Sequence, residues 1–405
     1  AWLINFTNPS GMVTEAVMKY GKWDKVIGLC NVPVSAMMKE PETIGKTLDQ
    51  LTYKFAGLNH FHWHRVYDEN GKEVTQDIID AMYEGKDSGI PVNIHKVPFF
   101  KEQLDAMKML PCGYHRYYYR QQEMLAHGLE EYSDPEVGTR GQQVKQTEAE
   151  LFELYKDPNL DHKPEQLAKR GGAHYSDAAC ETIASIYSNA NRHIVVTTKN
   201  NGAVPDLPAD CAVEVSAYIG ATGAKAIAFG ELQPAEKGWL QCMKNMEHCV
   251  EAAAVTGDYG MALQAFILNP QIPSGENAKR VLDELLLAHK KYLPQFAEKI
   301  ADKRKGASFM YIVLRILQIV ALVVFLWGKS NNNAEHLMGA GGPFLVWGSF
   351  AVMIIASYLS RKEYLKNHEV TQEQMTAGNR RSWILVVVIL LAAVALTAVQ
   401  FFMKD

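Results

Sequence analysis

The sequence has few cysteines and no excess of positive charge. Its 405 residues include six cysteines, which form no CxxC pair and follow no regular spacing. This usage argues against a secreted disulfide scaffold and favours a reducing, cytosolic setting. The net charge of −4 leaves no basic footprint of the kind that nucleic acid requires, so no nucleic-acid partner is expected.

A glycine-rich dinucleotide loop is also missing. The glycine cluster at residues 339–342 follows no strand pattern, and we interpret it as an ordinary loop. The chain begins with Ala1 and shows neither an initiator methionine nor a signal peptide. Because residues 1–6 already have the pattern of a buried strand, we expect the chain to be a fragment that lacks its front part.

Hydrophobic periodicity predicts alternating strands and helices over the first 300 residues. Strands are expected at residues 1–6, 26–29, 58–67, 193–198 and 211–218. Ile44, Leu48, Leu51 and Phe55 recur at helical spacing before Gly57, which predicts a helix in that segment. The alternation indicates an α/β layered fold.

Polar side chains lie close to the ends of three predicted strands. The segment Asn-Phe-Thr-Asn-Pro-Ser-Gly at residues 5–11 leads from a strand into a helix. Cys30 directly follows the strand at 26–29, and His60 lies near the start of the strand at 58–67. A thiolate and an imidazole are good transition-metal ligands, and their softness favours zinc or iron. From spacing alone, however, such a pair is more often two ordinary core residues.

In this order, these segments resemble the NAD- and manganese-dependent glycoside hydrolases of family 4, in particular the 6-phospho-β-glucosidases. The resemblance runs from residue 1 to about residue 300 and includes LPCGYHRYYY at 110–119 and RGGAHYSDAAC at 170–180. It implies an α+β substrate half of a Rossmann/lactate-dehydrogenase-like enzyme whose N-terminal dinucleotide-binding part is missing. The expected substrate- and metal-binding domain spans residues 1–305.

The resemblance assigns chemical roles to three residues. It implies that Cys30 and His60 bind a divalent metal, Mn²⁺ in this family, and that Tyr114 removes the proton from C2 of the sugar. The family oxidises the C3 hydroxyl with NAD, eliminates the aglycone, adds water and returns the hydride. A phenol with a pKa of about 10 needs roughly 4 kcal/mol to ionise at pH 7, much of which a nearby dication could supply. Without the glycine-rich loop, the chain is expected to bind NAD poorly or not at all.

Three further residues are expected to contact the substrate, a phosphorylated disaccharide or β-glucoside. Asn8 and Asn31 resemble substrate-positioning amides, and Asn31 favours a β-linked substrate because the α-glucosidase branch tends to carry Asp there. Both amides could instead cap turns. Arg140 could bind the sugar phosphate, although a lone arginine is more often a surface residue. His62 and His64 are interpreted as bystanders, and a homo-oligomer is expected.

The last hundred residues are far more apolar than the rest. Stretches at residues 309–327, 344–359 and 383–403 predict three transmembrane helices within a region spanning 306–405, with the lipid bilayer as partner. Basic residues precede the first stretch and separate the second from the third, which predicts a cytoplasmic catalytic part and a tail in the cytoplasmic membrane. The alternative is three buried helices of a soluble protein.

Two other functions remain open. The chain could be a 6-phospho-α-glucosidase or α-galactosidase of the same family, or a catalytically inactive, membrane-tethered module that binds sugar phosphates. A relative of lactate dehydrogenase would share the fold, but that chemistry has no use for the pair of Cys30 and His60. The sequence does not identify the aglycone.

Overall fold

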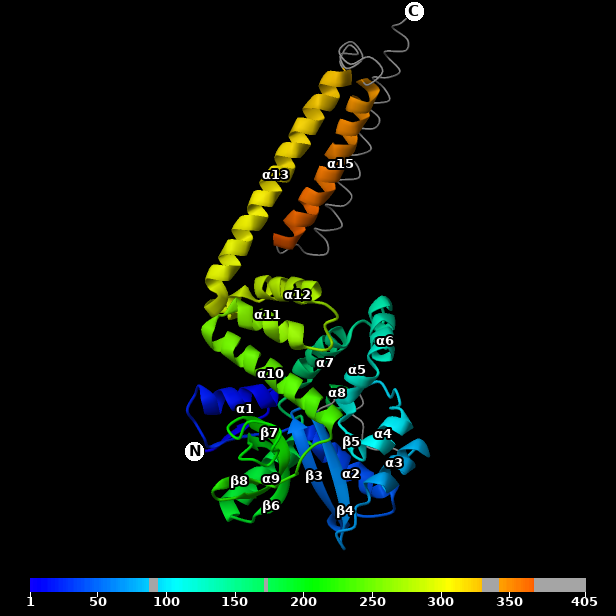
Figure 1. The fold of residues 1–405 in the computed structure, drawn as a ribbon, viewed down its shortest axis with the longest axis vertical. Coiled ribbons are helices and arrows are strands. Elements are labelled where there is room, and N and C mark those ends of the chain that lie inside the picture. The colour runs from blue at the N-terminus through cyan, green and yellow to red at the C-terminus, as the bar shows by residue number, and fades with distance from the viewer. Residues whose placement is uncertain (87–93, 171–173, 330–341, 368–405) are drawn as a thin grey trace, which may run out of the picture. The chain divides into compact units, whose positions relative to one another are not determined.

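The structure is a computed structural model that describes residues 1–86, 94–170, 174–329 and 342–367. The chain divides into two compact units, Ala1–Ala288 and His289–Asp405. The first unit contains one mixed β-sheet with helices packed on it, and the described part of the second unit consists of helices (Figure 1).

The strands are β1 (Leu3–Asn5), β2 (Val26–Gly28), β3 (Leu51–Leu58), β4 (Phe61–Asp68), β5 (Leu110–Pro111), β6 (Arg192–Lys199), β7 (Ala212–Gly220) and β8 (Gly223–Ala226). The α-helices of the first unit are α1 (Ser10–Lys19), α2 (Asn31–Thr43), α3 (Thr75–Tyr83), α4 (Lys101–Met107), α5 (Arg116–Tyr119), α6 (Gln121–Ser133), α7 (Arg140–Leu154), α8 (Gln166–Arg170), α9 (Tyr175–Ser188), α10 (Pro234–Thr256), α11 (Tyr259–Leu268) and α12 (Gly275–Ala288). Short 3-10 helices are η1 (Leu48–Gln50), η2 (Gly113–His115), η3 (Lys290–Tyr292) and η4 (Pro294–Phe296), and the second unit adds α13 (Ala297–Lys329) and α15 (Gly342–Asn367).

The sheet has the strand order β1-β2-β6-β7-β3-β4-β5, with β8 paired to β7. β1 and β2 are parallel, whereas the other described pairs are antiparallel. Because β1 and β2 run in the same direction, the loops that follow them emerge at the same edge of the sheet. The expected α/β architecture of the first unit is therefore confirmed.

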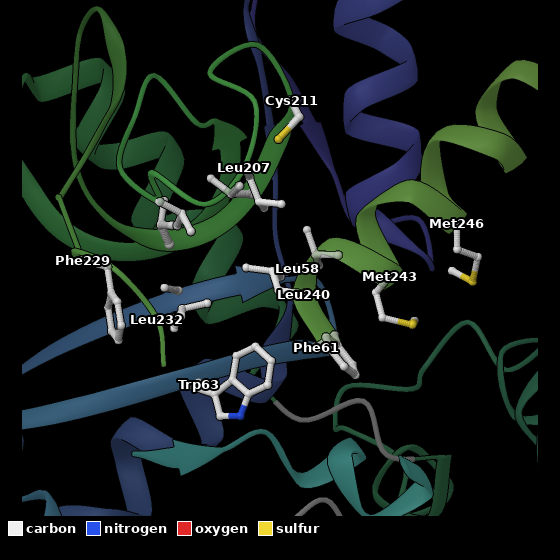
Figure 2. Packing of buried hydrophobic residues seen from close by; sticks show 14 of the residues in the cluster. Leu58, Phe61, Trp63, Leu207, Cys211, Phe229, Leu232, Leu240, Met243 and Met246 are labelled. Atoms are coloured by element: carbon white, nitrogen blue, oxygen red, sulfur yellow. The ribbon is translucent and has the colours of Figure 1, made fainter. Parts of the chain in front are cut away.

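The largest core cluster lies between the central strands and α10. Figure 2 shows Leu58, Phe61 and Trp63 of the β3–β4 hairpin close to Leu240 and Met243 of α10. Trp63 and Leu240 are fully buried. α10 has Pro234 in its first turn and ends at Gly257, which has a left-handed backbone (φ 74°). The core thus fixes the hairpin whose turn carries His60.

The helix predicted around residues 44–55 is wrong. Leu51–Leu58 form strand β3, and the preceding Thr47 and Gln50 form a capping box around the short helix η1. In β3 the side chains of Leu51, Tyr53 and Phe55 are buried, as expected for period-2 alternation. Residues four positions apart lie on one face of a strand as well as of a helix, so Leu51 and Phe55 fit both patterns.

Buried charges hold α1 against α10 and β7. Glu15 on α1 is fully buried. Its carboxylate accepts hydrogen bonds from the backbone N–H of Ala212 and from Nζ of Lys244, both at 2.8 Å, and lies 2.8 Å from Nε2 of His248. Burial opposes ionisation, but the His248 and Lys244 partners outweigh it and hold the pKa of Glu15 below its ordinary value. This cluster fixes the helix that follows the loop of residues 6–9.

The predicted transmembrane helices are wrong where the structure describes them. Within the described ranges, no helix is both long and apolar enough to cross a membrane. A span needs about 20 mostly apolar residues, whereas charged residues occupy the first turns of α13 and the last two turns of α15, which shortens the apolar part of each helix. The third stretch, 383–403, lies outside the described residues. The expected bilayer partner and location in the cytoplasmic membrane depended on these spans and are withdrawn with them.

Helices α13 and α15 contact each other through apolar side chains. Other apolar residues on them, such as Ile319 and Ile355, are exposed. The buried members of their shared cluster are Ala321, Phe325, Phe350 and Met353. The second unit is therefore, in its described part, an antiparallel helix pair with its own small core (Figure 1).

We predict that Gly57→Ala destabilises the protein strongly. Gly57 has φ 153°, and a Cβ there would lie 2.4 Å from both Cα of His62 and the carbonyl oxygen of Phe61. The clash and the backbone strain together should lower the free energy of unfolding by about 3 kcal/mol, measured by urea denaturation. Gly71→Ala is the matched control, because Gly71 has φ 77° and open space around its Cα. It should cost only about 1 kcal/mol; equal costs would contradict the packing argument.

We also predict that Glu251 makes stability fall as pH rises. Burial, together with the negative charge of Glu15, raises the pKa of Glu251 from 4.5 to about 8. Between these values the folded state keeps a proton that the unfolded chain releases, so the stability present below pH 4.5 is lost as pH rises toward 8. Glu251→Gln should flatten this part of the stability profile, measured by urea denaturation below, within and above the window. Glu276→Gln removes an exposed glutamate and should leave the slope unchanged.

Candidate functional site

One line of paired residues crosses the sheet close to the end where the predicted site residues lie. Each residue in the line pairs in the sheet register with the next one. The last residue, Cys112, directly follows β5, and its backbone N–H donates to the carbonyl oxygen of His62. The line consists of Asn5, Gly28, Thr197, Glu214, Gly57, His62 and Cys112. Strands that are far apart in the sequence therefore contribute neighbouring side chains to one row.

The middle of this row holds a buried carboxylate. Glu214 on the central strand β7 is 1% exposed. Its register partner Gly57 has no side chain, so His62 on the next strand can approach the carboxylate across the glycine. Nδ1 of His62 lies 2.6 Å from one carboxylate oxygen, and Nδ2 of Asn59 donates to the other at 2.9 Å. Glu214 thus contacts both sides of the β3–β4 turn.

The turn between β3 and β4 has two residues, Asn59 and His60. His60 has a left-handed backbone with φ 62°, which is uncommon for a residue other than glycine. Besides its bond to Glu214, the Asn59 amide accepts a hydrogen bond from the backbone N–H of Ser10 at 3.1 Å. One side chain therefore joins the turn to the start of α1 and to the central strand.

Tyr114 lies next to His60 and to a small buried cluster that contains Cys30. Its ring stacks on the imidazole of His60, with centroids 4.4 Å apart and planes at 27°. The same ring packs against the small buried cluster of Cys30, Val32 and Cys112. The structure thus places Cys30 and His60 around one tyrosine, although they come from different loops.

Cys30 directly follows β2 and caps helix α2. Its sulfur accepts a hydrogen bond from the backbone N–H of Val32 at 3.5 Å and lies 4.0 Å from Oδ1 of Asn31. Burial, and then the charge of Glu214, raise the pKa of the Cys30 thiol well above its ordinary value. Burial lowers the pKa of His60, which favours the neutral imidazole that binds metals. A bound dication would oppose the effect on Cys30, because metals bind the thiolate.

The two remaining predicted residues lie in different settings. Asn8 is exposed in the loop between β1 and α1, two residues before Ser10. Arg140 begins α7, and its Nη2 donates to the carbonyl oxygens of Lys169 and Arg170, each at 3.0 Å. Burial raises the pKa of Tyr117, and the charge of Arg140 partly offsets this effect. The ring of Tyr117 stacks on that of Tyr114, with centroids 6.4 Å apart. Asn31 thus lies beside the sulfur of Cys30, and Tyr114 packs on the cluster that contains Cys30. Asn8 is instead exposed, and Arg140 binds the backbone at the end of α8.

The neighbouring tyrosines belong to the core. Tyr118 and Tyr119 pack on the main apolar cluster, and the Tyr119 hydroxyl accepts a hydrogen bond from Nε1 of Trp63 at 3.3 Å. Burial raises the pKa of Tyr118 to about 12 and that of Tyr119 further. Ionising these two phenols is therefore costly, and they lie on the main core, whereas Tyr114 stacks on His60.

Sequence reasoning assigned no role to Asn59 or Glu214. His62, interpreted as a bystander, is buried beside Glu214. Burial alone would lower its pKa, but the adjacent Cys112 and Glu214 raise it to about 10, which favours an imidazolium paired with the carboxylate. His64 instead pairs with Glu40 at 3.0 Å. The available signal for Glu214 was a single charge inside the apolar run of residues 211–218.

Comparison with known proteins identifies the family. The profile described as "Family 4 glycosyl hydrolase C-terminal domain" matches residues 55–272, and "Family 4 glycosyl hydrolase" matches residues 1–45. The probable 6-phospho-beta-glucosidase of Bacillus subtilis is 48% identical over 300 residues, covering 74% of this chain and 67% of the relative. The 6-phospho-beta-glucosidase of Escherichia coli is 38% identical over 309 residues, covering 76% and 68%.

A solved structure agrees with this result. It is the 6-phospho-beta glucosidase from Thermotoga maritima with manganese, NAD⁺ and glucose-6-phosphate, at a TM-score of 0.62 and 30% identity, covering 72% of this chain and 67% of that one. The chain belongs to family 4 of the glycosyl hydrolases. It is accordingly related to enzymes that cleave glycosidic bonds, and the resemblance inferred from its sequence motifs is confirmed.

The residues at the site fit a divalent metal better than they fit NAD. A thiol and an imidazole that border the same tyrosine are a suitable pair of donors for a transition-metal ion. The described residues contain no set of three His, Cys, Asp or Glu side chains that could hold a metal alone, so any further ligands would come from substrate or water. In the part of the chain that the structure describes, no glycine-rich turn leads from a strand into a helix, so we assign no NAD contact.

We predict that the turn position of His60 stores backbone strain. Because glycine adopts a positive φ without a steric penalty, His60→Gly should be about 1 kcal/mol more stable than His60→Ala in urea denaturation. The control is Arg65 in the middle of β4, where the order should reverse because glycine weakens a strand interior. If alanine matched glycine at position 60, the turn would not be strained.

Proposed function

We propose that this chain supplies the substrate- and metal-binding half of a 6-phospho-β-glucosidase that depends on NAD and a divalent metal. The main support is that the Tyr114 ring stacks on His60 and packs on the small cluster that contains Cys30. Three loops from separate strands and helices produce this arrangement, and none of the three residues is needed there to fill the main core. Sequence identities of 48% and 38% to enzymes named 6-phospho-β-glucosidases support the same substrate class.

In this proposal the chain's own residues bind the sugar and remove one proton. Cys30 and His60 would hold the metal, which would supply a Lewis acid for the sugar hydroxyls. Tyr114 takes the proton from C2, which is acidified by oxidation at C3, and the aglycone then leaves. Tyr114 is half-buried, stacks on His60 and packs on the cluster that contains Cys30, a position that suits a base whose ionisation needs a nearby positive charge.

The remaining residues position the substrate. The side chain of Asn31 lies beside the sulfur of Cys30, where an amide could contact a sugar hydroxyl next to the metal. Asn8 is exposed in the loop that follows β1, at the same edge of the sheet. Arg140 binds two carbonyl oxygens through Nη2 alone, and a guanidinium has further N–H donors for a phosphate. We infer that these three residues orient the 6-phosphorylated sugar.

A β-glucosidase is favoured over the α-specific alternatives. Asn31 stands where the α-glucosidase branch tends to carry Asp, and an amide cannot act as an acid toward a poor leaving group. NAD and Mn²⁺ are proposed as the cofactors because the solved relative from Thermotoga maritima contains manganese and NAD⁺. The enzyme would then use oxidation and elimination, a recognised exception to the two-carboxylate mechanism of most glycosidases.

The test is release of nitrophenol from 4-nitrophenyl 6-phospho-β-glucoside with NAD and Mn²⁺ supplied. The chain should be assayed alone and with the part of the Bacillus subtilis relative that it does not cover. We expect activity in at least the second assay, loss on adding a chelator, and little release from the α-anomer. Absence of nitrophenol release in both assays would instead favour the inactive binding module.

Tyr114→Phe separates the base from its neighbours. Because the variant keeps the ring but removes the ionisable hydroxyl, kcat should fall by about 10²–10⁴-fold. Exchange of the C2 proton with deuterated solvent should fall in parallel, measured by NMR. Tyr117→Phe is the matched control, since its ring stacks on Tyr114 without bordering His60, and should change kcat only a few-fold. Equal losses in both variants would show that Tyr114 is not the base.

A further inference from the structure

Glu214 is buried without a role in the proposed chemistry. It is 1% exposed on the central strand, where a carboxylate is costly unless it is paired and hydrogen-bonded. Both of its oxygens point toward the β3–β4 hairpin. Oε2 accepts a hydrogen bond from Nδ2 of Asn59, and Oε1 lies 2.6 Å from Nδ1 of His62. A carboxylate that served only the core would not need to reach the turn.

The contacts of Asn59 connect this carboxylate to both predicted metal ligands. Asn59 directly precedes His60 in a two-residue turn, so fixing its side chain restricts the strained backbone of His60. The Asn59 side chain also lies close to the Cys30 sulfur. Ser10 donates to the other end of the same amide, which fixes its orientation. Glu214 is thus hydrogen-bonded to Asn59, which lies beside both ligand loops.

We propose that Glu214 is a positioning residue for the metal site. Through Asn59 it holds the His60 imidazole and the Cys30 sulfur in a geometry that can share one divalent cation, and its negative charge favours that cation. The inference rests on the metal site of the proposed function. Residues that orient metal ligands from behind commonly affect metal affinity by about 10–100-fold, which sets the expected scale.

The fold contains a matched control for this role. Glu40 on α2 and His64 on β4 form a second buried carboxylate–imidazole pair, with the imidazole nitrogen 3.0 Å from both carboxylate oxygens. Glu40 is 3% exposed, so its burial is like that of Glu214. It lies near the end of α2 and pairs with His64 rather than with the turn of Asn59 and His60, so it should share the structural role but not the positioning role.

The experiment is a titration of the full chain with Co²⁺. Binding is monitored by the charge-transfer absorption between the thiolate and cobalt. Wild type should bind Co²⁺ with this absorption, and Mn²⁺ should compete. Glu214→Gln keeps the size of the side chain and one acceptor oxygen for Asn59 but removes the charge. It should weaken Co²⁺ binding by about tenfold or more, while Glu40→Gln should bind like wild type. Thermal unfolding without metal reports any general loss of stability.

A second variant checks the connection through Asn59. Asn59→Ala should also weaken Co²⁺ binding, and the double variant with Glu214→Gln should be little weaker than the poorer single variant, because both act through one contact. Equal Co²⁺ affinity of Glu214→Gln and wild type would overturn the inference, as would equal losses in Glu214→Gln and Glu40→Gln. Failure of wild type itself to show the absorption would overturn the metal site on which both proposals rest.

Discussion

A carboxylate inside a β-sheet must be compensated within a few ångströms, and the need to compensate Glu214 explains much of the sequence around the site. The charge cannot be reached by water, since Glu214 is 1% exposed. Gly57 leaves space across the strand, His62 supplies the facing imidazole, and Asn59 supplies an N–H at the turn. The same three residues then determine how the β3–β4 turn is held, and the turn determines where His60 lies.

The local chemistry of the site could be predicted from the sequence, but the connections within it could not. Cys30 and His60 lie next to short apolar runs, and side chains at the ends of strands commonly form sites. The family motifs then gave each a role. Glu214 comes more than 150 positions after Asn59, with which it forms a hydrogen bond. No periodicity in a single sequence shows which strands pair, so a contact of this range requires the sheet order.

Two errors in the fold have related physical causes. Leu51 and Phe55 are four positions apart, a spacing that one face of a helix and one face of a strand share, so hydrophobic spacing could not identify β3. The apolar stretches of the last hundred residues were assigned to lipid because they are long. Hydropathy measures the tendency to leave water but not the partner, and Phe325 and Phe350 contact each other across two helices.

The shortness of the β3–β4 turn has a consequence for how this chain can vary. Two residues join strands that pair without interruption from Leu51 to Asp68. Side chains alternate between the faces of a sheet, so gaining or losing one residue in β4 would move His62 to the opposite face and bring an apolar neighbour toward Glu214. We therefore expect this hairpin to accept a length change more readily beyond Asp68, where the chain is exposed, than in the turn itself. The alternation of the sheet thus constrains the length of the turn that carries His60.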